Sequence, residues 1–544
     1  MAPAVRMPVS GLAAQTLGSS RRVVVANAST TMTSRPAACF AGALPAAFPP
    51  APGAAASSSA RSSFARGSGA FGAPRGLHHP HPRSFSSSPF VAEAASTAQA
   101  DASPPKGRKV GKSSAGDGGS KGLIDLKSPK GTRDFHPEEM RQQTWLFSKF
   151  REVSHLFGYE EIAAPVLESE ELFVRKAGEE ITDQLYNFTD KGDRRVALRP
   201  ELTPSLARLV LQKGKGLPLP AKWFAIGQCW RYERMTRGRR REHYQWNMDI
   251  VGVPGVEAEA EVLAAICTFF QSVGIGPEDV GMKISNRKVL QAVTERYGVT
   301  AELFGPVCVI VDKMEKIPRE KVEAELAALG VDTAAIDGII SALGIKDLPA
   351  LRELLGDNTE AVDELEKLFS LLEAYGFKDW LVFDASVVRG LAYYTGTVFE
   401  GFDRKGELRA ICGGGRYDKL LSTFGGEDQP MVGFGFGDAV IVELLKDKGL
   451  LPTTDKTEVD DVVFAMGEDL RAEGIRVAQK LRAGGRRVQL VLEDKKMKQV
   501  FKMVERTTAE RLLVVGSDEA ARGVVKVKDL AAREEVEVAF DDLK

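Results

Sequence analysis

A dense run of arginines marks the part of this sequence best suited to phosphate chemistry. The run reads Arg231-Tyr-Glu-Arg-Met-Thr-Arg-Gly-Arg-Arg-Arg241. Arginine carries a permanent charge on a planar fork of donors, which matches a phosphate group in two hydrogen bonds at once. The strand-like residues before Arg231 and the glycine at 238 predict a hairpin with a basic tip. A solvated basic loop is an equally open reading of the run by itself, because most charge runs face water.

A second polar group precedes this run, in Leu198-Arg-Pro-Glu-Leu-Thr-Pro204. The carboxylate of Glu201 and the hydroxyl of Thr203 suit an ammonium group, although Glu201 alone reads more simply as a helix-capping acid. The five cysteines form no C-x-x-C pair, and no G-x-x-x-x-G-K-[ST] loop is present. We therefore expect neither a cysteine-held metal nor a P-loop. Three of the six histidines lie within residues 78–81, so chemistry that needs a histidine cluster is nearly excluded.

The elements that position these residues follow from periodicity. A helix is predicted over 138–157, with acids in its first turn and Gly158 at its end. A strand is predicted over 162–167, and its proline confines it to an edge or an interface. Further strands are predicted over 195–199, 221–226, 229–233 and 243–251. Few helices separate them, which favours an antiparallel sheet in an α+β fold over a doubly wound sheet.

Taken together, these segments resemble a known family. The stretch 224–233, which ends Cys-Trp-Arg-Tyr-Glu before the arginine-rich loop, resembles motif 2 of class II aminoacyl-tRNA synthetases. The strand 162–167 resembles motif 1, the dimer-forming strand of that class. Val388-Arg-Gly-Leu-Ala-Tyr-Tyr-Thr-Gly-Thr-Val-Phe-Glu400 and Gly413-Gly-Gly-Arg-Tyr-Asp-Lys-Leu420 resemble the histidine-recognition segments of histidyl-tRNA synthetases. With Pro129-Lys-Gly-Thr-Arg-Asp134, the resemblance covers about residues 128–543.

The resemblance implies an aminoacyl-tRNA ligase that activates L-histidine with ATP and Mg²⁺ and transfers it to the 3′ end of tRNA(His). The substrate carboxylate is the nucleophile, so the protein supplies positioning and charge stabilisation. For ATP the resemblance implies Arg231, Glu233, Arg389 and Arg416, with Arg231 and Arg389 as the catalytic pair on the α-phosphate. For histidine it implies Glu201, Thr203, Gln245, Asp249, Tyr393 and Tyr394. It implies no metal ligands from the protein.

Three positions depart from the family pattern. Asp249 stands where many members carry Glu, and Ala392 stands where Asp is frequent. In Gly433-Phe-Gly-Phe-Gly-Asp-Ala-Val440, which corresponds to motif 3, the usual arginine is Val440. That arginine normally lies against the ATP phosphates. We expect Arg416, another basic residue or Mg²⁺ to supply the missing charge.

The resemblance also predicts the domain organisation. Residues 126–285 and 376–450 are expected to form the two parts of the catalytic domain, with a helical insertion domain at 286–375 between them. A plain helical insertion without RNA contact is the alternative for that domain. Residues 458–544 are expected to form an α/β anticodon-binding domain, with strands over 461–465, 487–492 and 511–515 and helices over 468–483 and 495–505. Its candidate RNA-facing residues are Arg486, Arg487, Lys495, Lys496, Lys498 and Lys502.

Residues 1–125 are predicted to be a transit peptide followed by a linker. No Asp or Glu occurs before residue 93, whereas arginine and serine recur, which is the composition of organellar transit peptides. Chloroplast, mitochondrion or both fit this composition equally. The mature chain carries no run of about 18 apolar residues, so no membrane partner is expected.

Two other classes of function remain open. One is a non-catalytic regulator, since synthetase-like subunits of ATP phosphoribosyltransferase exist, although these resemble the catalytic core alone. The other is an RNA-binding pseudo-synthetase, which Val440 and Ala392 would support. The leading prediction is an active homodimer whose partners are ATP, L-histidine and tRNA(His).

Overall fold

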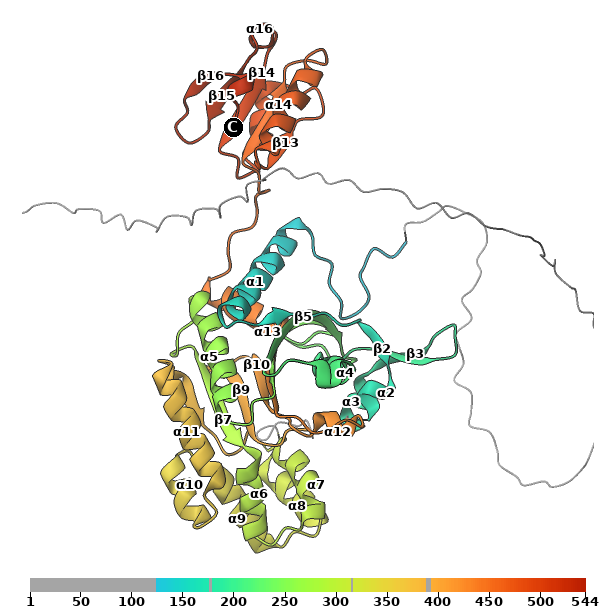
Figure 1. The fold of residues 1–544 in the computed structure, drawn as a ribbon, viewed down its shortest axis with the longest axis vertical. Coiled ribbons are helices and arrows are strands. Elements are labelled where there is room, and N and C mark those ends of the chain that lie inside the picture. The colour runs from blue at the N-terminus through green and yellow to red at the C-terminus, as the bar shows by residue number, and fades with distance from the viewer. Residues whose placement is uncertain (1–123, 176–178, 315–316, 388–392) are drawn as a thin grey trace, which may run out of the picture. The chain divides into compact units, whose positions relative to one another are not determined.

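The computed structural model describes residues 124–175, 179–314, 317–387 and 393–544 of the 544-residue chain. Its largest element is an eight-stranded sheet with the order β1-β5-β6-β11-β10-β9-β7-β8 (Figure 1). The strands are β1 (Glu160–Glu161), β5 (Ala221–Trp230), β6 (Glu242–Val251), β7 (Val280–Asn286), β8 (Leu381–Phe383), β9 (Thr397–Asp403), β10 (Cys412–Arg416) and β11 (Met431–Gly437). Neighbours are antiparallel except for β1 with β5 and β7 with β8. The predicted α+β class with an antiparallel sheet is confirmed.

Strand β6 separates the hydrophobic core from a polar face. Its side chains alternate, so Trp246, Met248 and Ile250 join the core while Gln245 and Asp249 fall on the opposite face. Trp246 stacks on Phe150 at 4.6 Å between ring centroids. The helices whose buried residues complete this core are α1 (Pro137–Leu156), α5 (Glu257–Ser272) and α13 (Asp438–Lys448). The polar face is therefore left for chemistry.

The predicted strand at 162–167 is largely wrong. Only its last residue, Leu167, lies in a strand, β2 (Leu167–Ser169). Pro165 has no N–H to offer a neighbouring strand. The Nη1 atom of Arg199 instead donates to the carbonyls of Ala164 at 2.7 Å and Pro165 at 3.4 Å. A side chain thus binds the carbonyls in the middle of the segment. Backbone hydrogen bonds remain at its ends, where the Ile162 N–H donates to the Phe224 carbonyl at 2.8 Å and the Arg199 N–H donates to the Val166 carbonyl at 2.9 Å.

The same arginine explains a second difference. Two strands were expected over 221–226 and 229–233, with a break near Gly227, but β5 runs unbroken from 221 to 230. A Cβ added at Gly227 would collide with Nη2 of Arg199. The glycine therefore admits a neighbouring side chain and does not end the strand.

A smaller sheet, in the order β2-β4-β3, is built from strands between residues 167 and 198. Its other strands are β3 (Tyr186–Thr189) and β4 (Arg195–Leu198), both antiparallel to their neighbours. The helices near it are α2 (Glu171–Val174), α3 (Glu179–Gln184), α4 (Thr203–Lys213) and α12 (Leu420–Thr423). Glu201 and Thr203 lie at the start of α4, directly after β4.

The described residues between Arg287 and Ala374 are mainly helical, and the cluster α6–α10 lies beside β7 (Figure 1). The helices are α6 (Arg287–Arg296), α7 (Ala301–Val311), α8 (Arg319–Ala328), α9 (Thr333–Leu343), α10 (Leu348–Leu355) and α11 (Glu360–Ala374). Asn286 caps α6, because its side chain accepts a hydrogen bond from the Lys288 N–H. The apolar faces of these helices share the core of the large sheet.

The C-terminal module has a five-stranded sheet in the order β13-β12-β14-β15-β16. Its elements are β12 (Asp461–Ala465), α14 (Arg471–Ala483), β13 (Val488–Leu490), α15 (Met497–Val504), β14 (Arg511–Val515), α16 (Ser517–Ala521), β15 (Val524–Asp529) and β16 (Glu535–Ala539). The residues of α14 and α15 belong to separate hydrophobic clusters. Strands β12 and β14 span the predicted residues, whereas β15 and β16 were not predicted. Among the described residues, no helix is both long and apolar enough to cross a bilayer.

Candidate active site

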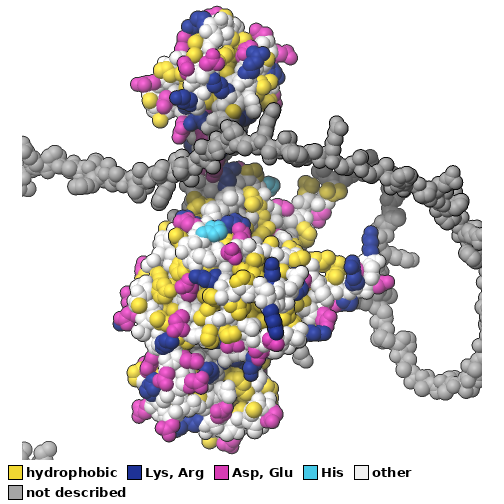
Figure 2. Space-filling view, viewed as in Figure 1, with side chains coloured by type: hydrophobic (Ala, Val, Ile, Leu, Met, Phe, Trp, Pro, Cys, Tyr) yellow, Lys and Arg dark blue, Asp and Glu magenta, His cyan; other side chains and the backbone are white. Residues whose placement is uncertain are grey.

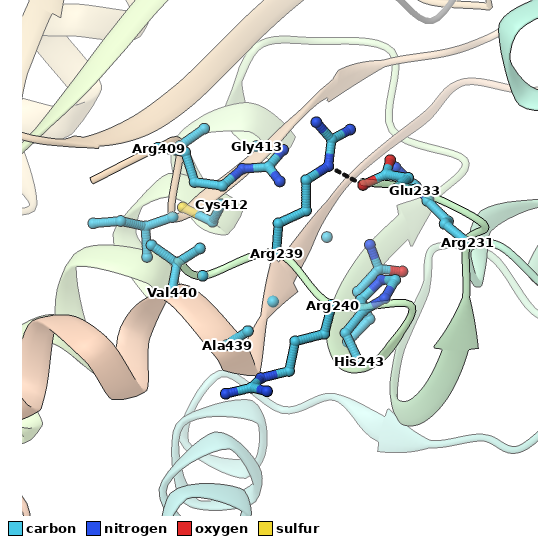
Figure 3. Close-up of a pocket in the computed structure, with 16 residues that line it drawn as sticks. Arg231, Glu233, Arg239, Arg240, His243, Arg409, Cys412, Gly413, Ala439 and Val440 are labelled. Carbon is cyan, nitrogen blue, oxygen red and sulfur yellow. Dashed lines mark hydrogen bonds and ion pairs between the residues drawn. The ribbon is translucent and has the colours of Figure 1, made fainter. Parts of the chain in front are cut away.

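A pocket of about 180 Å³ opens where the β5–β6 hairpin meets β10 and β11 (Figure 3). The hairpin contributes Arg231, Glu233, Gly238, Arg239, Arg240, His243 and Gln245 to its lining. The approach to β10 contributes residues 409–413, and the turn from β11 into α13 contributes Gly435, Gly437, Ala439 and Val440. The pocket therefore joins segments that are about 200 residues apart in the sequence.

The base of the hairpin fixes Arg231. Its backbone N–H donates to the Arg241 carbonyl at 2.8 Å, and its Nε donates to the Pro200 carbonyl at 3.0 Å. Gly238, at the tip, has a φ of 70°, a left-handed conformation that glycine adopts without strain. The backbone thus turns sharply, and Arg231 is held with its fork available to a ligand.

The arginines of the hairpin divide between the protein and the pocket. Arg239 forms an ion pair with Glu233, drawn as a dashed line in Figure 3. Arg237 ties the tip to α13, because its Nη2 lies 2.6 Å from Asp447 and its Nε lies 3.3 Å from Glu443. The predicted basic hairpin is thus a ligand-facing loop that is anchored at its tip. The reading of a wholly solvated loop does not fit this geometry.

His243 lies in the same pocket as an uncharged group. Burial first, and then the charges of Arg231, Arg133 and Arg409, lower the pKa of its imidazole to about 3. The ring is therefore neutral at physiological pH and adds no further cation to the arginines. It offers a flat face and one acceptor nitrogen.

Further along the same face of β6 lies a cluster of carboxylates and tyrosines, which we call the tyrosine–carboxylate cluster. Its members are Glu201, Asp249, Tyr393, Tyr394 and Tyr417. The Tyr417 hydroxyl donates to Asp249, and the Tyr393 hydroxyl donates to Glu201 at 3.4 Å. The rings of Tyr393 and Tyr394 are 4.7 Å apart. Burial, followed by the nearby carboxylates, raises the pKa of Tyr393 and Tyr417 well above the usual value, so both hydroxyls stay protonated.

Gln245 connects the two regions. It lines the pocket, and its Oε1 accepts a hydrogen bond from the Cys229 thiol at 3.5 Å. A Cβ at Gly435 would lie 2.9 Å from the Gln245 Nε2, and one at Gly433 would collide with Asp249. The glycines of β11 therefore make room for the polar side chains of β6. One strand thus supplies polar groups to both the pocket and the cluster.

Comparison with known proteins identifies the family. A family model described as "Histidyl-tRNA synthetase" matches residues 131–438, and one described as "Anticodon binding domain" matches residues 460–544. The chain belongs to the histidyl-tRNA synthetase family. Its sequence is 60% identical over 421 residues to a chloroplastic/mitochondrial histidine–tRNA ligase of Arabidopsis thaliana, covering 77% of this chain and 86% of that protein. It is 39% identical to a histidine–tRNA ligase of Opitutus terrae, covering 78% and 98%.

Solved structures agree with this membership. A crystal structure of histidyl-tRNA synthetase from Nostoc sp. PCC 7120 matches with a TM-score of 0.64 and 28% identity, covering 77% of this chain and 98% of that one. The expectations of a class II synthetase fold and of an aminoacyl-tRNA ligase are confirmed. The assigned residues for ATP and histidine remain predictions, which geometry can support or weaken.

Within this histidyl-tRNA synthetase fold, most of the predicted site residues come together. Arg231, Glu233 and Gln245 line the pocket, and Glu201, Asp249, Tyr393 and Tyr394 form the cluster beside it. Thr203 is buried two residues after Glu201, at the first position of α4. Arg389 and Ala392 lie outside the described residues.

Arg416 is the exception. Its guanidinium is buried and forms an ion pair with Glu259 at 2.6 Å. It also donates to the carbonyls of Val253 at 3.0 Å and Gly255 at 2.9 Å, and it lies 3.3 Å from Asp418. Burial raises the pKa of Glu259 although Arg416 opposes the shift. The predicted contact of Arg416 with ATP is therefore corrected: this arginine binds protein acceptors and does not line the pocket.

Sequence reasoning missed three residues of the site. Tyr417 follows Arg416 in a segment that resembles the family, so the sequence places it near the site. The sequence does not show that its side chain points toward Asp249. His243 was read as part of a strand. Arg409 stands alone in a loop, where neither periodicity nor a motif singles it out.

Proposed function

We propose that this histidine–tRNA ligase forms histidyl-adenylate across the pocket and the tyrosine–carboxylate cluster. ATP occupies the arginine-lined pocket, and L-histidine occupies the cluster. The observation that carries the proposal is the polar face of β6. Gln245 and Asp249 lie on this same face, Gln245 in the pocket and Asp249 in the cluster, so one strand joins the two regions. A carboxylate of one substrate and a phosphate of the other would then meet beside Arg231.

The reaction needs no nucleophile from the protein. An oxygen of the histidine carboxylate attacks the α-phosphorus, the bond to the bridging oxygen breaks, and pyrophosphate leaves with that electron pair. Negative charge accumulates on the α-phosphate oxygens, where a fixed guanidinium stabilises it most. Arg231 meets this need because the Pro200 carbonyl holds its Nε and leaves the end of the fork for the phosphate. Arg389 is proposed as its counterpart and stays a prediction from the sequence.

Mg²⁺ fits this pocket as part of the substrate. Among the described residues that line the pocket, Glu233 is the one carboxylate, and Arg239 is its ion-pair partner. No group of three or more potential metal ligands occurs within the described part of the chain. Mg²⁺ characteristically binds through phosphate oxygens and water with few protein ligands. ATP is therefore proposed to enter as its Mg²⁺ complex, in which the ion neutralises phosphate charge.

The cluster suits an imidazole and an α-amino group. An imidazole presents one donor and one acceptor, and Asp249 with protonated tyrosine hydroxyls supplies the complementary set. Glu201 and Thr203 are proposed to receive the ammonium group. A side chain without two such nitrogens would leave buried polar groups unpaired, which can reject a competitor by about 10⁴–10⁵.

The C-terminal module is proposed to hold the anticodon arm. On the face shown in Figure 2, this module carries basic and acidic side chains interspersed. Arg486, Arg487 and Lys495 are ion-paired with protein carboxylates. Lys498 and Lys502 are exposed on α15 and have no ion pair within the described residues. These two lysines are the better candidates for phosphate contacts.

Two properties of the whole protein are also proposed. Organellar delivery is inferred from the acid-free, arginine-containing first 92 residues. A homodimer is inferred around residues 162–167, where the Leu167 side chain is 45% exposed. Sedimentation of the purified protein tests the second inference directly.

Histidine-dependent exchange of labelled pyrophosphate into ATP tests the proposed reaction. We expect exchange with L-histidine and none with the other amino acids. A folded protein that binds tRNA but shows no exchange with histidine would overturn the proposal and favour an RNA-binding pseudo-synthetase.

A further inference from the structure

The motif-3 position of this chain cannot supply the usual cation. Val440 lies in the first turn of α13 and is buried, with 5% of its surface exposed. The tip of the arginine-rich hairpin covers it, because a Cβ added at Gly238 would lie 3.1 Å from the Val440 Cγ2. The space beside this helix turn is thus filled by backbone of the hairpin. A cationic side chain that replaces the motif-3 arginine must therefore come from an element other than α13.

Arg409 reaches the same pocket from the loop between β9 and β10. It lies three residues before Cys412, the first residue of β10, and lines the pocket together with Val440. In Figure 3 its side chain extends across the pocket toward Arg239. Partial burial first, and then the charge of Arg239, lower the pKa of Arg409, so the two guanidinium groups are electrostatic neighbours.

The cation at Arg409 is not used by the fold. Its side chain makes no hydrogen bond and no ion pair within the described residues, and it is accessible to solvent. Arg416, the candidate named from the sequence, is buried against Glu259 and two backbone carbonyls. Arg240 also lines the pocket, but in Figure 3 its side chain points away from Arg409.

Burial and the charges of Arg239 and Arg231 lower the pKa of Arg409. The charges of Glu233 and Glu400 oppose this shift without cancelling it. An anionic ligand beside Arg409 would therefore stabilise its cation.

We propose that Arg409 replaces the missing motif-3 arginine and binds the β- or γ-phosphate of ATP. This assignment rests on the proposed function of the pocket and adds a residue to it. Arg231 then holds the α-phosphate, while Arg409 holds the part of ATP that departs as pyrophosphate.

Arg409→Ala tests the assignment, with Lys405→Ala as its matched control. Lys405 is a cation in the same loop, exposed and outside the pocket lining. Binding of ATP without histidine is measured by equilibrium dialysis, and KM values come from pyrophosphate exchange. Losing a charged hydrogen bond predicts roughly 10- to 100-fold weaker ATP binding for Arg409→Ala. AMP binding and the KM for histidine should change less than about twofold, since neither ligand reaches this arginine.

Arg409→Lys and Arg409→Met complete the set. Lysine restores the charge and should recover part of the affinity for ATP, whereas methionine should behave as alanine does. Unchanged ATP binding in Arg409→Ala, or an equal loss for ATP and AMP, would overturn the assignment. If the wild-type protein showed no exchange, the proposed function would fail, while the dialysis of ATP against AMP would still decide the role of Arg409.

Discussion

The nucleotide pocket and the tyrosine–carboxylate cluster share strand β6 but treat polar groups in opposite ways. In the pocket, Arg231 and Arg409 keep guanidinium donors that have no acceptor within the described part of the chain. In the cluster, Asp249 and Glu201 are buried and already accept hydrogen bonds from tyrosine hydroxyls. A highly charged ligand can be met by solvated cations, because it brings its own counter-charge. A small neutral ring needs a pre-arranged, desolvated set of partners.

Arg416 belongs with the cluster by this criterion, since it is as buried and as fully bonded as the carboxylates. The contrast between Arg416 and Arg409 shows that an arginine's role depends on which acceptors surround it. Both arginines lie within one eight-residue stretch, 409–416. Only their environments differ.

The largest effect, a loss of stability, is expected when the buried ion pair between Arg416 and Glu259 is broken. Replacing Arg416 with methionine leaves Glu259 buried without its cation, which costs about 3–5 kcal/mol of unfolding free energy. Urea denaturation measures this loss. The double replacement Arg416→Met with Glu259→Leu should recover most of it, because no lone buried charge remains. Normal stability together with a tenfold higher KM for ATP would restore the original prediction for Arg416.

The next largest effect, a loss of exchange rate, is expected in the pocket, for Arg231→Ala. Removing a donor aimed at developing charge raises the barrier by about 2.7–4 kcal/mol, a loss of roughly 10²–10³ in exchange rate. Stability should change little, because the side chain makes one hydrogen bond to the Pro200 carbonyl. The control is Arg234→Ala, an exposed cation of the same loop that does not line the pocket. Equal losses of exchange rate in both variants would mean that the positive potential of the loop matters and that Arg231 makes no specific contact with the phosphate.

Asp249→Asn tests whether the cluster binds histidine separately from the ATP pocket. The amide keeps an oxygen for the Tyr417 hydroxyl but loses the charge, so the KM for histidine should rise roughly 10- to 100-fold. The KM for ATP should stay within about twofold. Asp403→Asn is the matched control. Within the described residues, that buried carboxylate accepts hydrogen bonds only from the backbone N–H groups of Lys405 and Glu407 in its own loop. A rise in the KM for ATP in Asp249→Asn would mean that the two regions are not separate.

The smallest effect concerns His243 and pH. Its folded pKa of about 3 lies below the unfolded value of about 6.5, so between these pH values the unfolded chain binds a proton that the folded chain does not. Stability must therefore fall as pH drops below about 6.5 and be fully present above it. From pH 7 to pH 5 this one group accounts for a loss of about 1–2 kcal/mol.

His243→Gln should remove that part of the pH dependence, as measured by urea denaturation at the two pH values. His155→Gln, at an exposed histidine of α1, serves as the control. If His243→Gln and the wild-type protein lost stability equally on acidification, the imidazole would not be held neutral in the fold.

Local sequence determined most elements of this protein and much of its site. Periodicity set α1, β6, β12 and β14 to within one residue or so, because side-chain alternation records which face of an element is buried. Ordered motifs located Arg231, Glu233, Glu201 and the tyrosine pair. The family followed from these motifs, and comparison confirmed it.

Only the tertiary structure decided which of the described arginines face the pocket. Arg416 belongs to a family motif, but its guanidinium is hydrogen-bonded to Glu259, which is 157 residues away. Arg409 belongs to no motif, yet its side chain lines the pocket.

The same holds for the separate strands expected over 221–226 and 229–233 and for the strand expected over 162–167. In both places the side chain of Arg199 decides the outcome, because it lies against Gly227 and donates to the carbonyls of Ala164 and Pro165. Spacing along a chain fixes which face a residue takes, but burial and charge pairing depend on residues that approach from other strands. Those approaches exist only once the sheet has formed.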